Sequence, residues 1–135
     1  MSVNFINEKD FHDFVAALIG ALPVFGPVAK RSRFVFERLE EAGDLRLDYD
    51  VTILPPKKLF FPPAQDLVRF RGTEFEGCVA PQEKVLLGVH FYDVKAIDQT
   101  DLLFAERNYD VNYMANREAT TIVAANVQKV FARAF

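Results

Sequence analysis

Apolar positions near the amino terminus repeat at the spacing of an amphipathic helix. Asn7 and Asp10 precede a series of apolar side chains three or four residues apart, namely Phe11, Phe14, Val15, Leu18 and Leu22. Asparagine caps helices well because its side-chain oxygen accepts a hydrogen bond from a free backbone N–H group. We therefore expect a capped amphipathic helix that is stopped by Pro23.

Strand patterns follow this helix. The apolar and aromatic segment 33–39 predicts one strand, and Gly43 marks a turn after it. Apolar and polar residues then alternate from 44 to 53, with Leu45, Leu47, Tyr49, Val51 and Ile53 as the apolar members. This period of two predicts a strand with one face in the core and one in water. Because a fully covered parallel strand would not keep a polar face, we expect this strand to be antiparallel.

A proline pair stands at each end of the segment LPPKKLFFPP, residues 54–63. Proline restricts its own backbone and that of the residue before it, so we expect an ordered loop, extended or turned, that does not enter a helix. The apolar residues Leu59, Phe60 and Phe61 would anchor this loop on the core. Lys57 and Lys58 would point outward. A hairpin-like stretch is expected at 72–77, between two glycines.

The second half of the chain predicts a βαβ unit. The continuous apolar run 84–89, KVLLGV, suits a strand buried on both faces. Asp93 can cap a helix that runs to about Phe104, a second short helix is expected over 111–118, and 120–124 should be another buried strand. We therefore predict a mixed α/β fold. An N-terminal helix and antiparallel strands would precede a βαβ unit with parallel strands, in a mixed sheet.

The last residues carry a second helical stripe, formed by Val127, Val130, Phe131, Ala134 and Phe135. The stripe predicts a C-terminal helix, and it stops in mid-pattern. A docked terminal helix and a polypeptide cut at a domain boundary both remain open. A chain of 135 residues, half of them apolar, is long enough for one core. We expect residues 1–135 to form a single α/β domain.

Charge and targeting signals exclude several partners. Sixteen basic residues stand against nineteen acidic ones, and this net charge of -3 gives no overall positive field for nucleic acid or anionic lipid. The uncharged run 14–29 contains two prolines and is shorter than the ~20 residues that a membrane span needs. The amino terminus lacks the basic region of a secretory signal. We expect a cytoplasmic protein without a nucleic-acid or membrane partner.

Few side chains can carry chemistry. His12 and His90 lie in different elements and Cys78 is the single cysteine, so no zinc or iron-sulfur ligand spacing is present and we expect no metal site. The glycines do not form a dinucleotide or P-loop motif, and no nucleophilic serine motif occurs. One cysteine excludes an internal disulfide and fits a reducing compartment.

The end of the 84–89 strand is the first choice for a binding site. His90, Tyr92 and Asp93 follow this strand, and ligands collect at the carboxyl ends of strands in open α/β sheets. A helix that begins there offers free amide donors to an anion, and Lys57 or Lys58 would be a second wall. The same residues also fit a structural role, with Asp93 as a routine cap and His90 as a satisfied residue. We favour the structural role.

Three segments that include these residues resemble a known family. They are PPKKLFFPP, VLLGVHFYDVKAIDQTDLLF and DVNYMANREATTIVAANV, in this order. Together they are similar to the N-terminal region of the iron-sulfur subunits of cytoplasmic sulfhydrogenases (the hydrogenase beta subunit) and of the anaerobic sulfite reductase A subunit. The family patterns G-V-R-P-C-D-x-x-A-I and R-R-E-x-T are matched at Gly88, Val89, Asp93, Ala96, Ile97, Arg117 and Glu118. His90, Phe91 and Tyr92 replace the family's Arg, Pro and Cys, so no role of that thiol carries over.

The resemblance implies a subunit that passes electrons through 4Fe-4S clusters. Its partners would be a flavin and nicotinamide-binding subunit and a catalytic hydrogenase or sulfite reductase subunit. The cluster-ligating cysteines of the family lie downstream, beyond the position of Phe135. This chain would then be the cofactor-free N-terminal fragment of a longer iron-sulfur subunit, serving as a docking surface or a wall of the cluster pocket, without catalysis of its own.

The candidate docking or binding residues are Lys57, Lys58, His90, Tyr92, Asp93, Arg117 and Glu118. Two other functions stay open. One is a stand-alone small-anion or nucleotide-binding protein or enzyme that uses the turn from His90 to Asp93. The other is a plain protein-interaction domain without a redox partner.

Overall fold

The structure of this chain, a computed structural model, describes residues 3–106 and 108–130. Three α-helices occur in these residues, α1 (Glu8–Ala21), α2 (Phe91–Ala105) and α3 (Val111–Glu118), with two 3-10 helices, η1 (Ala42–Asp44) and η2 (Pro56–Phe60). The strands are β1 (Val24–Lys30), β2 (Arg33–Arg38), β3 (Val68–Arg71), β4 (Glu74–Gly77), β5 (Lys84–His90) and β6 (Thr120–Ala125).

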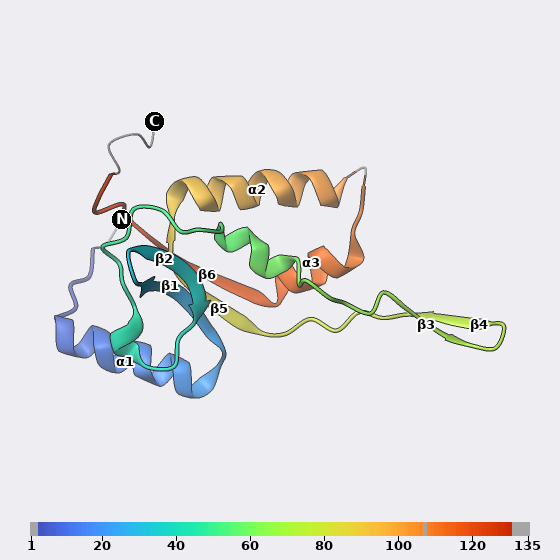
Figure 1. Cartoon of the computed structure of the whole chain (residues 1–135), viewed down its shortest axis with the longest axis horizontal. Coiled ribbons are helices and arrows are strands. Elements are labelled where there is room, and N and C mark those ends of the chain that lie inside the picture. Colours follow the sequence, from blue (N-terminus) through green and yellow to red (C-terminus); the bar gives the residue numbers. More distant parts are fainter. Residues whose placement is uncertain (1–2, 107, 131–135) are drawn as a thin grey trace.

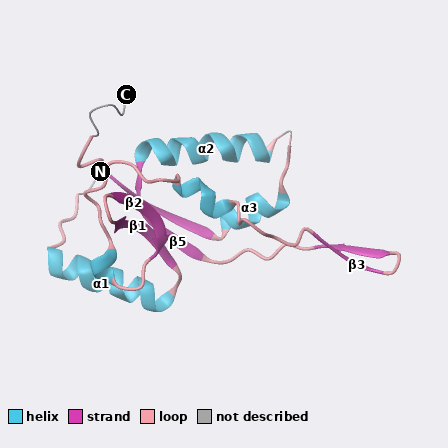
Figure 2. Ribbon diagram, viewed as in Figure 1, coloured by secondary structure: helices cyan, strands magenta, loops and turns pink. Residues whose placement is uncertain are grey.

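The central sheet has the strand order β2-β1-β5-β6. Strand β1 runs antiparallel to β2, whereas β5 lies parallel to both β1 and β6. Helix α1 covers one face of the sheet, and α2, α3 and η2 lie on the other (Figure 1). Figure 2 shows the same three layers by element type. The predicted mixed α/β fold, with an N-terminal helix, antiparallel strands and a βαβ unit, is confirmed.

Strand β5 lies in the middle of the core, as predicted for the run 84–89. All seven of its residues are buried. Val85 and Leu87 pack toward α1, whereas Leu86 and Val89 pack toward α2 and α3. Side chains alternate between the faces of a regular strand, so Leu86 and Val89 can share a face only because a bulge at Gly88 shifts the register.

Local sequence signals place α1 and α3 correctly. The Asn7 side chain accepts a hydrogen bond from the Asp10 N–H group at 2.8 Å, and α1 ends before Pro23. Helix α3 has its predicted bounds. Helix α2, however, begins earlier than expected, with His90 at the cap position and Asp93 inside the first turn. The prediction that Asp93 caps this helix is wrong because β5 passes directly into α2 without a connecting loop.

The sequence patterns did not predict β1, since Gly26 and Pro27 resemble strand breakers. The ladder between β1 and β5 is limited to Val24 and Phe25, so the N–H group that Pro27 lacks is not required there. Gly26 lies where a Cβ atom would come within 2.9 Å of the Leu45 side chain. Both residues therefore fit a strand whose far half diverges from its parallel neighbour.

The predicted antiparallel strand over 45–53 is wrong. This segment is irregular, and its strand-like contact is a single parallel bridge between Phe34 and Thr52. Tyr49 is buried, but Val51 and Ile53 are each more than half exposed. The segment is fixed by single anchors, such as the Arg46 N–H group on the Pro27 carbonyl at 2.9 Å, and not by a ladder.

The proline-flanked loop also differs from its prediction. Residues 56–60 form the 3-10 helix η2, which Pro56 can begin because the first N–H group of a helix needs no partner. Phe60 anchors the segment as expected and is 1% exposed, Leu59 is partly buried, and Phe61 stays 41% exposed.

Two predictions near the carboxyl end need correction. Residues 120–124 do form a strand, β6, but it lies at the edge of the sheet and Thr120 is its one buried residue. The predicted terminal helix is absent from residues 126–130, which are irregular. The rest of that stripe, at 131–135, lies outside the described residues.

Strands β3 and β4 form the predicted hairpin, which projects from the body of the molecule (Figure 1). Its turn contains Gly72 with a φ of 65°. All eight strand residues are exposed. Within the described part of the chain, none of the helices has the length and apolar character that crossing a membrane requires.

Candidate functional site

The turn from β5 into α2 holds a pair of stacked rings. The His90 imidazole lies on the Tyr49 ring with centroids 3.9 Å apart and planes 1° apart. His90 is 0% exposed and Tyr49 1% exposed. Tyr49 comes from the irregular segment 45–53, so this segment covers the residue that the sequence singled out as a candidate ligand contact.

Hydrogen bonds determine which ring nitrogen of His90 carries the hydrogen. The Tyr92 hydroxyl donates to the Asp50 carbonyl at 2.8 Å, so its oxygen accepts the hydrogen of His90 Nδ1 at 2.7 Å. The imidazole is therefore the Nδ1–H tautomer, and burial lowers its pKa, which keeps the ring neutral. Nε2 is buried and has no hydrogen-bond partner among the described residues.

Gly88 completes the packing beneath the stacked rings. Its carbonyl accepts a hydrogen bond from the Tyr49 hydroxyl at 2.9 Å, and burial raises the pKa of that phenol. Gly88 has a φ of 82°, and a Cβ atom on it would lie 2.7 Å from the Leu47 side chain. The strand end, the bulge and the segment 45–53 thus form one interlocked unit.

The outer part of the turn is more open. Asp93 is half-buried, and this burial raises the pKa of its carboxyl group, while the nearby Lys57 ammonium group lowers it. Tyr92 is partly buried beside them, and Phe91 is 63% exposed. The structure thus brings Lys57, Tyr92 and Asp93 together, as the sequence suggested. Lys58 is exposed and borders a different pocket, which is formed between η2 and β2.

Arg117 and Glu118 lie elsewhere. They end α3 just before Thr120, which is paired with Lys84 at the start of β5. Since seven strand residues span about 20 Å, this region is well separated from His90. The Arg117 guanidinium group binds the Asp101 carboxylate at 2.9 Å and lies over the Phe60 ring. These contacts connect α3 to α2 and η2, and Glu118 is exposed.

The geometry of the turn favours a structural role for His90. A neutral, fully buried imidazole offers no surface to a nucleotide or phosphate. A small-molecule site using His90 together with Asp93 therefore has no support from the packing, whereas Lys57, Tyr92 and Asp93 remain accessible to a partner surface. Tyr49 was missed as a member of this cluster because its alternating pattern indicated a strand and gave no sign of its distant neighbour.

The side chains of this chain do not fit an iron-sulfur cluster. A 4Fe-4S cluster is held by four cysteine thiolates, and Cys78 is the single cysteine in the sequence. Cys78 is partly exposed and free. Across residues 3–106 and 108–130, no group of three or more His, Cys, Asp or Glu side chains is placed to hold a metal ion.

Comparison with known proteins gives one informative relative. The chain is 31% identical over 118 residues to the sulfhydrogenase 2 subunit beta of Pyrococcus furiosus. The alignment covers 87% of this chain and 35% of the relative, so the chain spans about a third of the relative's length. No protein-family model matches the chain. No solved structure matches it either.

Proposed function

Because this chain is a homologue of a sulfhydrogenase beta subunit, we propose that it forms the N-terminal docking part of an iron-sulfur electron-transfer subunit. The single observation that carries this proposal is the alignment across 87% of the chain. The complex would be an oxidoreductase of the hydrogenase or sulfite reductase type and would work in the cytoplasm. On this proposal, residues 1–135 are one α/β domain of a longer polypeptide and catalyse nothing alone.

The redox centres would lie in the longer polypeptide. This chain supplies one thiol where a cluster needs four, so 4Fe-4S clusters would depend on cysteines in other segments. Electrons would pass between a flavin and nicotinamide-binding subunit and a catalytic hydrogenase or sulfite reductase subunit. The contribution of this chain would be to hold the cluster-bearing part against one of these partners.

The projecting hairpin supports a docking role. Phe70 and Phe75 are paired across β3 and β4 and are 75% and 78% exposed. The neighbouring pairs, Arg69 with Glu76 and Arg71 with Glu74, place charges on the opposite face because side chains alternate along strands. The hairpin is therefore an amphipathic ribbon with an uncovered apolar face, and two strands alone are marginally stable in water. We propose that a partner subunit covers this aromatic face.

The turn at the end of β5 would form a second part of the docking surface. Lys57, Tyr92 and Asp93 are available there, and Lys58 and Glu118 lie exposed at other points. His90 would act as a positioning residue that fixes Tyr92 through its hydrogen bond of 2.7 Å. Arg117 would support α3 from within.

Affinity capture of the natural subunit tests this proposal. A tagged wild-type subunit, expressed in its own cells under anaerobic conditions, should retain the flavin-binding and catalytic subunits, identified by mass spectrometry. Replacing Phe70 and Phe75 with serine should abolish this retention without lowering the thermal unfolding temperature of the protein. The matched control, Phe5→Ser, also removes an exposed phenylalanine, which is 96% exposed, and should retain both partners. Equal retention by the hairpin variant would contradict the docking role of the hairpin.

A further inference from the structure

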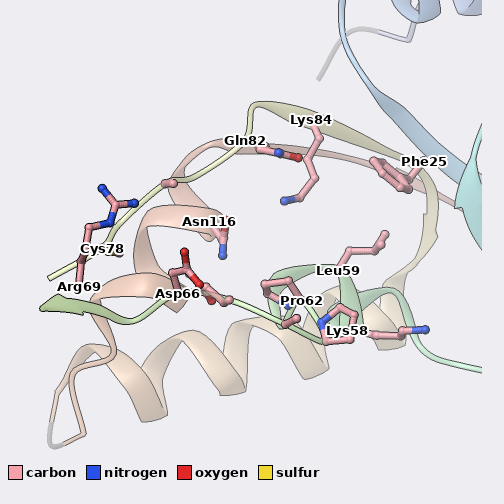
Figure 3. A pocket seen from close by; sticks show the side chains of 14 residues that line it. Phe25, Lys58, Leu59, Pro62, Asp66, Arg69, Cys78, Gln82, Lys84 and Asn116 are labelled. Carbon is pink, nitrogen blue, oxygen red and sulfur yellow. The ribbon is translucent and has the colours of Figure 1, made fainter.

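A cavity of about 610 Å³ lies at the opposite end of β5 from the His90 turn. It is bounded by the start of β5, by α3, by η2 with the loop that follows, and by the base of the hairpin (Figure 3). Polar and apolar side chains share its wall. The members that matter here are Lys84, Asn116, Gln82, Phe25 and Leu59.

Lys84 is the exceptional residue in this wall. It is 9% exposed, and its amino group is directed into the cavity (Figure 3). The described part of the chain provides no salt bridge to this ammonium group, because the five ion pairs found there involve other lysines and arginines. Burial accordingly lowers the pKa of Lys84. The stem of this side chain is packed among its neighbours and its ammonium group faces the cavity, where an anion can supply the missing counter-charge.

Asn116 offers a second donor to the same space. It is 7% exposed, and its amide also points into the cavity (Figure 3). The Asn116 Nδ2 atom donates one hydrogen to the Phe60 carbonyl oxygen at a long distance of 3.4 Å. Its second hydrogen is therefore available to a ligand. Leu59 and Phe25 lie on the other side of the cavity and give it an apolar wall (Figure 3).

We propose that this cavity binds a small organic carboxylate. Its two oxygen atoms would accept hydrogen bonds from Lys84 Nζ and Asn116 Nδ2, and its carbon chain would lie against Leu59 and Phe25. The exposed residues of the rim add two cations, Lys58 and Arg69, against one acid, Asp66, and so favour an anion. This site borders the base of the docking hairpin, which contributes Arg69 to its rim, but its ligand contacts at Lys84 and Asn116 do not involve the aromatic face of the hairpin.

Titration of the 15N-labelled chain with hexanoate, followed by NMR, tests this site. We expect saturable shift changes in residues 82–86, in the segment 59–62 and at Asn116. Hexanamide has the same carbon chain without the charge and should bind about tenfold more weakly or worse, since a hydrogen bond between charged groups is lost.

Matched variants separate the site from general charge effects. Lys84→Met keeps the length of the side chain, removes its charge and should abolish the response to hexanoate. Lys95→Met removes a charge from the exposed surface of α2 and should bind as the wild type does. A flat titration, equal binding of hexanoate and hexanamide, or shift changes confined to the His90 turn would each overturn the proposal. The comparison of the two ligands on the wild-type chain holds even if Lys84→Met does not fold.

Discussion

The Tyr49 hydroxyl donates a hydrogen bond of 2.9 Å to the carbonyl of Gly88, and the ring of the same tyrosine is stacked on His90. This contact and the stacking of Tyr49 on His90 join the irregular segment 45–53 to the bulge in β5. Together with the Arg46 N–H group on the Pro27 carbonyl, these contacts hold a segment without a ladder against the core.

Tyr49→Phe should destabilise the chain by about 1–2 kcal/mol, because it keeps the ring stack but leaves the buried Gly88 carbonyl without its donor. Urea unfolding followed by circular dichroism measures this loss. Tyr109→Phe is the matched control, since Tyr109 is 64% exposed, and should change stability by less than about 0.5 kcal/mol. Equal stabilities of the two variants would show that the hydrogen bond contributes little.

The buried His90 should make stability depend on pH. Burial lowers its folded-state pKa, with a partial offset from Asp50, so the unfolded chain takes up a proton as the pH falls through about 6.5 while the folded chain does not. The contribution of this neutral ring to stability is thus complete above the unfolded pKa and declines as the pH falls toward the folded pKa. Urea midpoints at pH 7.5 and 5.5 should differ more for the wild type than for His90→Gln.

The control for this pH experiment is His12→Gln, because His12 is the other histidine and lies exposed on α1. This variant should retain the full pH dependence of the wild type. If His90→Gln also retained it, the buried imidazole would not be its source.

Gly88→Ala should cost about 2 kcal/mol or more, since an L residue is strained at a φ of 82° and its Cβ atom would press on Leu47. Gly43→Ala should have a small effect, because no atom lies within 4 Å of a Cβ placed there. Urea unfolding of both variants gives the comparison. A Gly88→Ala variant as stable as Gly43→Ala would mean that the bulge relaxes without cost.

Asp101 should contribute more to stability than Asp98, although both are on α2. Asp101 accepts hydrogen bonds from the Tyr113 hydroxyl at 2.6 Å and from Arg117 at 2.9 Å. Asp101→Ala should therefore cost about 1–3 kcal/mol. Among the described residues, Asp98 pairs only with Lys95 on the exposed surface, so Asp98→Ala should cost about 0.5 kcal/mol or less. Thermal unfolding of the two variants at one pH measures the difference. Similar midpoints would show that the hydrogen bonds of Asp101 to α3 do not stabilise the fold.

Local signals explain which elements the sequence predicted. The Asn7 cap with Pro23 beyond the helix end, and the full apolar run of β5, are determined by neighbours in the chain. The prediction of a strand over 45–53 failed because it depended on a partner strand that is distant in the sequence. Alternation can place Tyr49 in the core without any hydrogen-bonding partner strand, and sequence alone does not show whether such a partner exists.

In the candidate site, too, the contacts between sequence neighbours were predicted and the contacts between distant segments were not. Sequence adjacency correctly placed His90, Tyr92 and Asp93 at the strand-to-helix turn. It did not show that Tyr49 closes over His90, because this contact depends on the course of the chain between β2 and η2. Lys84 was overlooked because a lysine at the start of an apolar strand resembles an ordinary polar end. Its burial depends on α3 and η2, which are distant in sequence.

Iron determination on the natural full-length product tests the central proposal most directly. The product should be purified anaerobically, together with a matched sample of residues 1–135. We expect iron and acid-labile sulfide bound to the longer polypeptide, with a 4Fe-4S signal in electron paramagnetic resonance after reduction, and none on residues 1–135. A full-length protein that binds no iron would contradict the assignment to an electron-transfer subunit.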